Sequence, residues 1–246
     1  MATDGPLGPV GRSAAPDWAH YPLGGGGGRL SPGGLLGDWQ RRNADASLPL
    51  ALRQLEDAGN LDNVRLAIRA DEAAASGDPG LGGDAADLRR VTAGLGLGPV
   101  DPLPGLGYRG PVFMDSDIYK TLEAIGWELA RAGASEPAPG ADSGLTAFTS
   151  DVIALLDEAQ RPDGYLNSYF QASGEPRYAR LAWSHEMYCA GHLIQAAIAL
   201  HRGAGDDRLL AIAVKLADHL AREFLGGAKG LDGHPIIETA LAELYR

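Results

Sequence analysis

Apolar residues recur every three to four positions along much of the chain, which is the period of an amphipathic helix. The pattern is clearest over 115–131, where Asp115 or Ser116 can cap the start and four apolar residues share one face (Ile118, Leu122, Ile125 and Leu129). The same spacing predicts helices over 38–57, 61–75, 145–159, 184–202, 207–224 and 235–245, with Pro49 interrupting the first. No segment shows sustained period-two alternation, so we predict an all-α protein.

Two consecutive predicted helices differ in where their apolar residues lie. In 207–224 they form one stripe, as in a surface helix (Leu209, Ile212, Ala213, Leu216 and Leu220). In 184–202 they occur on nearly every side, which indicates a helix buried all round. This alternation is typical of inner and outer helices in an α/α toroid, and a helical repeat would give a similar one. A closed (α/α)6 toroid has more helices than the sequence predicts, so we expect a partial (α/α)6 toroid, about half of the barrel.

Glycine and proline are concentrated near the start of the chain. Residues 1–110 hold 22 of the 35 glycines and 10 of the 16 prolines. We interpret 1–36 as a flexible Gly/Pro-rich leader, 76–111 as an irregular stretch and 37–246 as one domain.

Charge and cysteine content exclude several classes of function. The net charge is -11 and there is no basic run, which argues against nucleic acid and membrane as partners. The single cysteine, Cys189, rules out an intrachain disulfide. The sequence shows no signal peptide and no run of about 18 apolar residues, so we expect a cytoplasmic protein.

Three polar residues interrupt the helix that is otherwise apolar all round. His185, Cys189 and His192 lie at i, i+4 and i+7, so they are expected to share a face. Such a strip either points into a ligand cavity or is hydrogen-bonded within the core. The two imidazoles would lie about 10 Å apart along the helix axis, too far to share one zinc ion. Cys189 and His192 alone could supply two ligands, with others from elsewhere in the chain. Cys189 is more often a small buried hydrophobe, so we expect no metal site in this chain.

Two other segments carry candidate chemistry. A Pro-Asp-Gly turn at Asp163 is followed by Tyr165 and two further aromatics, which either form a wall on which a sugar ring stacks or pin the loop to the core. His234 directly precedes a predicted helix, where its imidazole is expected to face the mouth of a toroid. We expect His201 and His219 to lie on the surface.

Six segments in order carry a family resemblance. They are 37–43, 59–63, 109–120, 160–167, 185–192 and 233–238. Together, over about residues 30–246, they resemble the β-L-arabinofuranosidases of glycoside hydrolase family 127.

The resemblance implies an α/α toroid followed by β-rich domains, and removal of terminal β-L-arabinofuranose from glycans with retention of configuration. It implies that carbohydrate is the partner and that His192 and His234 contact the sugar. His185, Asp163 and Tyr165 are further substrate-binding candidates.

In the family a zinc-bound cysteine is the nucleophile and a glutamate is the acid/base. The resemblance places these residues and the zinc ligands beyond Arg246, and Cys189 matches a different cysteine. We therefore expect zinc in the full-length family enzyme but none here, no catalytic residue in this chain, and an inactive fragment.

Two alternatives come from other classes of function. One is a non-catalytic sugar-binding or assembly-dependent partial toroid. The other is a toroid sugar epimerase or lyase that uses His192 and His234 as acid and base. A half-toroid also exposes the apolar flanks of its end helices, so we predict self-association.

Overall fold

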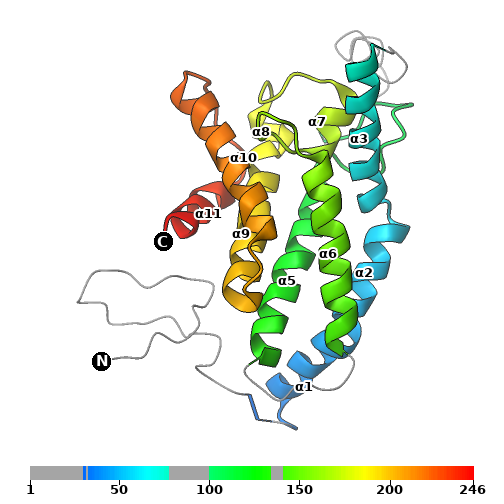
Figure 1. Ribbon diagram of the computed structural model, residues 1–246, viewed down its shortest axis with the longest axis vertical. Coiled ribbons are helices and arrows are strands. Elements are labelled where there is room, and N and C mark those ends of the chain that lie inside the picture. The colour runs from blue at the N-terminus through cyan, green and yellow to red at the C-terminus, as the bar shows by residue number, and fades with distance from the viewer. Residues whose placement is uncertain (1–29, 32, 78–99, 134–140) are drawn as a thin grey trace, which may run out of the picture.

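The computed structural model describes residues 30–31, 33–77, 100–133 and 141–246. Regular structure in these ranges is helical, without strands (Figure 1), so the predicted all-α class is confirmed for this part of the chain. The elements are α1 (Leu35–Arg42), the π-helix η1 (Asn43–Ser47), α2 (Leu48–Asp57), α3 (Asn60–Ser76), α5 (Asp115–Gly133), α6 (Ala141–Ala159), α7 (Ser168–Ser173), α8 (Leu181–Ser184), α9 (Glu186–Ala204), α10 (Arg208–Leu225) and α11 (Ile236–Tyr245). None of the described helices has the length and apolarity needed to span a membrane.

Parts of two predicted segments lie outside the described residues. These are 1–29 and 32 of the predicted leader, and 78–99 of the predicted irregular stretch. Of the described remainder of that stretch, 100–111 is irregular as predicted, whereas Ser76 is the last residue of α3. Helix α1 begins at Leu35, two residues before the predicted domain boundary.

A π-helical turn joins the first two helices just before a proline. Pro49 has no N–H, and its ring would clash with the carbonyl of Asp45 four residues earlier in a regular α-helix. In η1 the helix widens, and the Leu48 N–H donates to the Asn43 carbonyl five residues back. The predicted interruption at Pro49 is therefore a change of helical register, after which the chain continues as α2.

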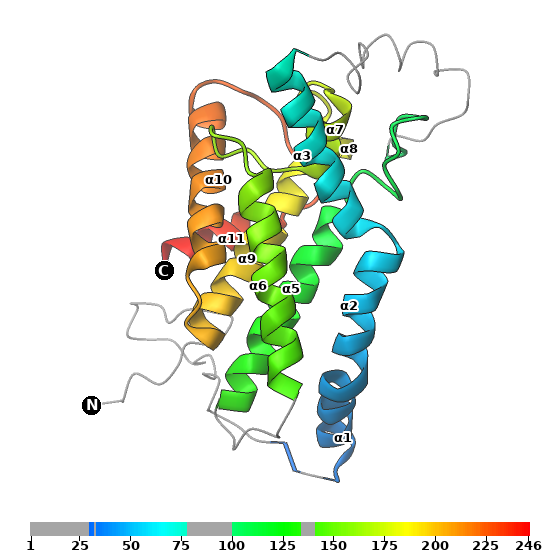
Figure 2. The same cartoon turned by 45° about the vertical axis from the view of Figure 1, so that its right-hand side comes forward.

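Helix α9 lies at the centre of the molecule and packs against α5, α10 and α11 (Figures 1 and 2). Its contact with α5 is the most extensive, because glycines occupy the crossing. A Cβ at Gly126 of α5 would lie 2.7 Å from the Ala199 carbonyl carbon, and one at Gly203 would overlap the Gly126 carbonyl oxygen. A Cβ at Gly191 would likewise lie 2.9 Å from the Ile237 nitrogen of α11. These glycines let the neighbouring backbones approach α9 closely.

Helices α10 and α6 lie together on one side of α9 and α5 in both views (Figures 1 and 2). The predicted stripe of α10 is at most 5% exposed (Leu209, Ile212, Ala213, Leu216 and Leu220). An amphipathic helix therefore covers one that is mostly buried, as the two apolar patterns predict.

Two short helices in the connection from α6 to α9 were not predicted. Helix α7 has six residues, all buried, and the Asn167 side chain caps it by accepting a hydrogen bond from the Phe170 N–H. Helix α8 ends at Ser184, the following residue His185 has a left-handed backbone with φ 56°, and α9 begins at Glu186. Helices of four and six residues are too short to show a helical period.

Candidate functional site

Three imidazoles and one phenol gather where the start of α9 meets the loop before α11. The Tyr188 ring lies in the middle, with its centroid 4.6 Å from that of His192 and 4.9 Å from that of His234. The His185 ring lies 5.6 Å from Tyr188 and 5.0 Å from His234. We call these four residues the histidine cluster. The structure thus brings the candidates His185, His192 and His234 together around Tyr188.

Asp232 fixes the two parts of the histidine cluster against each other. Its carboxylate accepts hydrogen bonds from the backbone N–H groups of Met187 (3.1 Å) and Tyr188 (3.3 Å), in the first turn of α9. It also accepts one from the N–H of His234 (3.0 Å). A carboxylate is stabilising at a helix N-terminus because the first N–H groups have no partner within the helix. Asp232 therefore ties the loop that carries His234 to the start of α9.

The face of α9 in the histidine cluster differs from the predicted strip. Cys189 was expected there with His185 and His192, but it is 1% exposed and its thiol faces the Phe113 carbonyl (Sγ–O 3.8 Å). The half-buried positions that share a face are Tyr188, His192 and Gln195. The reason is that His185 lies outside the helix in a left-handed conformation, so helical spacing does not place it above Cys189.

Lys120 of α5 reaches the histidine cluster from the neighbouring helix. Its Nζ donates hydrogen bonds to the Tyr188 hydroxyl oxygen (2.6 Å) and to Ser116 Oγ (3.3 Å), and lies 4.9 Å from the centroid of the Tyr188 ring. This distance is within the range of a cation–π contact. The site is therefore built by α5, α9 and the loop before α11.

His192 is uncharged at neutral pH. Burial, with the positive charge of Lys120 and the nearby His234, lowers its pKa from 6.5 to about 4. Its Nδ1 is buried and has no hydrogen-bond partner in the part of the chain that the structure describes. A neutral imidazole has one N–H donor and one acceptor nitrogen, so His192 suits a hydroxylated, uncharged ligand.

Cys189 and the histidine cluster do not fit a zinc site. Zinc needs several nitrogen or sulfur ligands at about 2.0–2.3 Å. Within the described residues, no three His, Cys, Asp or Glu side chains are grouped to hold a metal ion. Burial raises the pKa of the Cys189 thiol well above its usual value, which disfavours the thiolate that zinc would bind. Cys189 packs as a small residue in the apolar core.

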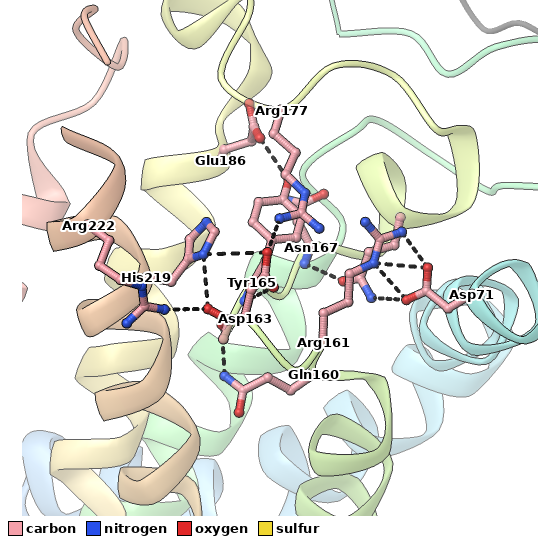
Figure 3. Close-up of polar contacts among 12 residues, drawn as sticks. Asp71, Gln160, Arg161, Asp163, Tyr165, Asn167, Arg177, Glu186, His219 and Arg222 are labelled. Carbon is pink, nitrogen blue, oxygen red and sulfur yellow. Dashed lines mark hydrogen bonds and ion pairs between the residues drawn. The ribbon is translucent and has the colours of Figure 1, made fainter. Parts of the chain in front are cut away.

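Asp163 belongs to a second polar network (Figure 3). Its carboxylate accepts hydrogen bonds from Arg177 Nη1 (2.6 Å) and the Tyr165 N–H (3.1 Å). Its backbone carbonyl accepts them from His219 Nδ1 (3.1 Å) and Arg222 Nη2 (2.6 Å) of α10. Burial raises the pKa of Asp163, but its bonds to Arg177 and Tyr165 lower it by more. Asp163 thus holds its loop against α10.

Tyr165 is buried in the same network. It is 1% exposed, and its hydroxyl donates a hydrogen bond to Glu186 Oε1 (2.8 Å). The Arg177 guanidinium lies 3.9 Å from the ring centroid, and Tyr178 and His219 make edge-on contacts. The two other aromatics of this segment are also buried (Tyr169 and Phe170). Of the two interpretations of the segment, the structure supports the loop pinned to the core, because Tyr165 has no open face for a sugar.

The residues before the turn attach this loop to two helices. Arg161 Nε lies 2.9 Å from both carboxylate oxygens of Asp71 in α3 (Figure 3). Gln160 Nε2 donates hydrogen bonds to the carbonyls of Ile212 (2.9 Å) and Gly164 (3.0 Å). The loop is therefore fixed on both sides.

Glu186 connects this second network to the histidine cluster. The carboxylate is 4% exposed and accepts hydrogen bonds from the Tyr165 hydroxyl and from the Tyr178 N–H (2.9 Å to Oε2). Burial raises the pKa of Glu186, although these bonds oppose the shift. Glu186 is the first residue of α9 and directly follows His185. The hydrogen bonds from the pinned loop therefore hold the start of α9, and with it the backbone next to His185, in place.

The expectation that His219 lies on the surface is wrong, because its side chain is 2% exposed. The Gly164 turn covers it: a Cβ at Gly164 would overlap the Lys215 carbonyl oxygen of α10 and lie 3.3 Å from the His219 Cβ. Without a side chain, the turn packs directly on α10. The sequence contained the Pro-Asp-Gly signal but no indication of which helix the turn would meet.

Sequence reasoning missed three residues of the site. Tyr188 was counted among the apolar residues of a buried helix, and Lys120 and Asp232 were not singled out. Their only signal was position, since Lys120 and Tyr188 lie inside segments that carry the family resemblance and Asp232 directly precedes another. The three come from separate elements, so no spacing rule relates them.

Comparison with known proteins agrees on one family. The family model for the β-L-arabinofuranosidase GH127 catalytic domain matches residues 32–246. A non-reducing end β-L-arabinofuranosidase of Bifidobacterium longum subsp. longum is 42% identical over 146 residues, which are 56% of this chain and 21% of that protein.

Solved structures give the same result. A GH127 β-L-arabinofuranosidase from Geobacillus stearothermophilus T6 matches with a TM-score of 0.59 and 32% identity. The GH127 β-arabinofuranosidase BT3674 matches with a TM-score of 0.61 and 27% identity. Each match covers 84% of this chain and 28% of the solved chain, so the chain spans between a fifth and a third of these relatives. The chain belongs to the GH127 β-L-arabinofuranosidase family and corresponds to part of its catalytic domain.

Proposed function

We propose that this chain forms a sugar-binding wall of a GH127 catalytic domain, in which His192 and His234 contact a terminal L-arabinofuranose unit. The histidine cluster carries the proposal, because imidazoles from two separate elements lie on either side of Tyr188. His192 is half-buried and His234 is exposed, so the cluster borders solvent. His185 is a further contact at its edge.

The chemistry of the histidine cluster suits an uncharged, hydroxylated ring. With Nδ1 buried, the other ring nitrogen of the neutral His192 imidazole, Nε2, donates to or accepts from a sugar hydroxyl according to its tautomer. The Tyr188 ring supplies an apolar surface beside it. The net charge of -11 provides no overall attraction for an anionic ligand.

We further propose that the helices here are about half of an (α/α)6 toroid, and that turnover requires the rest of the family domain. The solved relatives support this, because the match covers 28% of their chains. The buried Cys189, with its raised thiol pKa, is unsuited to serve as the nucleophile. Retaining hydrolysis of terminal β-L-arabinofuranosides is thus assigned to the completed domain.

Calorimetric titration of the chain with methyl β-L-arabinofuranoside tests the binding site. We expect binding that His192→Ala and His234→Ala each weaken about 10-fold, the effect of losing a well-placed hydrogen bond. His201→Ala is the control, because this exposed imidazole near the other end of α9 pairs with Asp207. Unchanged affinity in the His192 and His234 variants would contradict the site.

A turnover assay tests the second part of the proposal. With an aryl β-L-arabinofuranoside, zinc and a thiol, we expect the chain to release no aryl alcohol. Hydrolysis above that of the His192→Ala variant would show that the chain is catalytically sufficient and overturn this part.

A further inference from the structure

The Tyr188 hydroxyl has an unusual hydrogen-bond partner. The described partner of its oxygen is the Lys120 ammonium, at 2.6 Å. By contrast, the Tyr165 hydroxyl donates to the Glu186 carboxylate, and the buried Tyr108 hydroxyl pairs with Ser168 Oγ at 3.2 Å. Each of those two hydroxyls therefore has a partner within the protein that can accept its hydrogen.

The nature of lysine settles the direction of the bond to Tyr188. An ammonium has three N–H donors and no acceptor, so the Tyr188 oxygen accepts and its own hydrogen points elsewhere. No acceptor for that hydrogen occurs among the described residues. A phenol whose oxygen accepts from a cation is also a stronger donor, because the charge polarises its O–H bond.

The Tyr188 hydroxyl, whose hydrogen has no described acceptor, lies in the middle of the site. The Tyr188 ring lies between His192 and His234, and Ser116 helps to hold Lys120 in place by accepting a second hydrogen bond. We propose that the Tyr188 hydroxyl donates a hydrogen bond to an oxygen of the bound sugar, and that Lys120 is the positioning residue that orients and strengthens this donor. The inference rests on the proposed function, since it adds one more contact to the same sugar.

A double-mutant cycle tests whether Lys120 acts through Tyr188. The ligand is methyl β-L-arabinofuranoside, and the proteins are the wild-type chain, Tyr188→Phe, Lys120→Met and the double variant. We expect Tyr188→Phe to weaken binding about 3-fold to 10-fold, the usual range for one hydrogen bond, and Lys120→Met to weaken it less. The double variant is expected to bind like Tyr188→Phe alone, because without the hydroxyl Lys120 has nothing to orient.

Two controls separate this role from a structural one. Lys120→Arg keeps a donor-only cation and is expected to restore the affinity that Lys120→Met loses. The urea midpoint of each variant shows that it is folded, and Tyr188→Phe keeps the ring that packs on both imidazoles.

The outcomes distinguish this inference from the proposed function. No binding by the wild-type chain would overturn both. Binding that His192→Ala weakens and Tyr188→Phe does not would overturn only the role of Tyr188. Additive losses in the double variant, or no rescue by Lys120→Arg, would show that Lys120 does not act through the phenol.

Discussion

His192 is the residue from which we predict the clearest dependence of the stability of the fold on pH. Its pKa is about 4 in the folded chain and 6.5 in an unfolded one, so between these values the unfolded chain binds more protons. The stabilisation from keeping His192 neutral is therefore complete above about pH 6.5 and is lost as the pH falls towards 4.

Urea unfolding across this range measures the effect. We expect the free energy of unfolding of the wild-type chain to fall more steeply between about pH 6.5 and pH 4 than that of a His192→Gln variant. Comparing the two proteins cancels the contributions of the buried carboxyls, whose pKa values are raised (Asp115 and Glu186). Parallel curves would contradict the assigned pKa of His192.

Gly164 is the residue of the pinned loop at which we expect a substitution to destabilise the fold most. It has φ 89°, and a Cβ there would overlap the Lys215 backbone. Gly174→Ala is the matched control, because Gly174 has φ 66° and open space around it. We expect Gly174→Ala to cost about 1 kcal/mol for the left-handed backbone alone, and Gly164→Ala about 1–3 kcal/mol more for the clash. Equal urea midpoints for the two variants would contradict the close packing on α10.

Single residues were predictable where one element decides their surroundings. The stripe of α10 followed from spacing alone, and the family resemblance singled out His192 and His234. Contacts between elements were not predictable in this way: Lys120 meets Tyr188 only because α5 crosses α9. His219 was misplaced for the same kind of reason, since another element, the Gly164 turn, covers it.

At the scale of elements, the crossing of α5 and α9 offers a second test of packing. Gly126→Ala would place a Cβ 2.7 Å from the Ala199 carbonyl carbon, so we expect a loss of about 1–3 kcal/mol in the free energy of unfolding. Gly144 is the matched helical control, since it is exposed in α6 with open space around it. Gly144→Ala is expected to stabilise by about 0.5–1 kcal/mol, because alanine favours a helix. Thermal unfolding measures the change in stability of both variants. A Gly126→Ala variant as stable as the wild-type chain would contradict the close packing of α5 on α9.

The longer helices could be predicted because each repeats its apolar pattern over several turns. Helices α7 and α8 could not, since four and six residues give no period to detect. The widening at η1 was visible only as Pro49, which signals an interruption without saying what form it takes. The left-handed backbone of His185 also had no signal, and it displaced the predicted polar strip.

At the scale of the whole molecule, α11 exposes apolar side chains on one of its faces. Its Ala240 is buried against α9, whereas Leu241 is 39% and Tyr245 93% exposed, one turn apart on the helix. Exposed neighbouring apolar residues tend to be covered in stable proteins. This is the kind of flank expected to cause self-association.

Sedimentation velocity over a range of concentrations tests that prediction. We expect the average sedimentation coefficient to rise with concentration, and replacement of Leu241 and Tyr245 by glutamate to reduce the rise. Val214→Glu is the control, because Val214 is 42% exposed on a different helix, α10. A wild-type chain that remains monomeric at every concentration would contradict the prediction.

The most direct test of the account follows the histidine side chains themselves by NMR during titration with methyl β-L-arabinofuranoside. Imidazole Cε1–H signals are assigned with His192→Gln and His234→Gln variants, and the exposed His201 serves as the internal control. We predict that the His192 and His234 signals shift together along one binding curve while the His201 signal stays in place. Signals of His192 and His234 that do not move at saturating sugar, or that follow different curves, would contradict a shared sugar site.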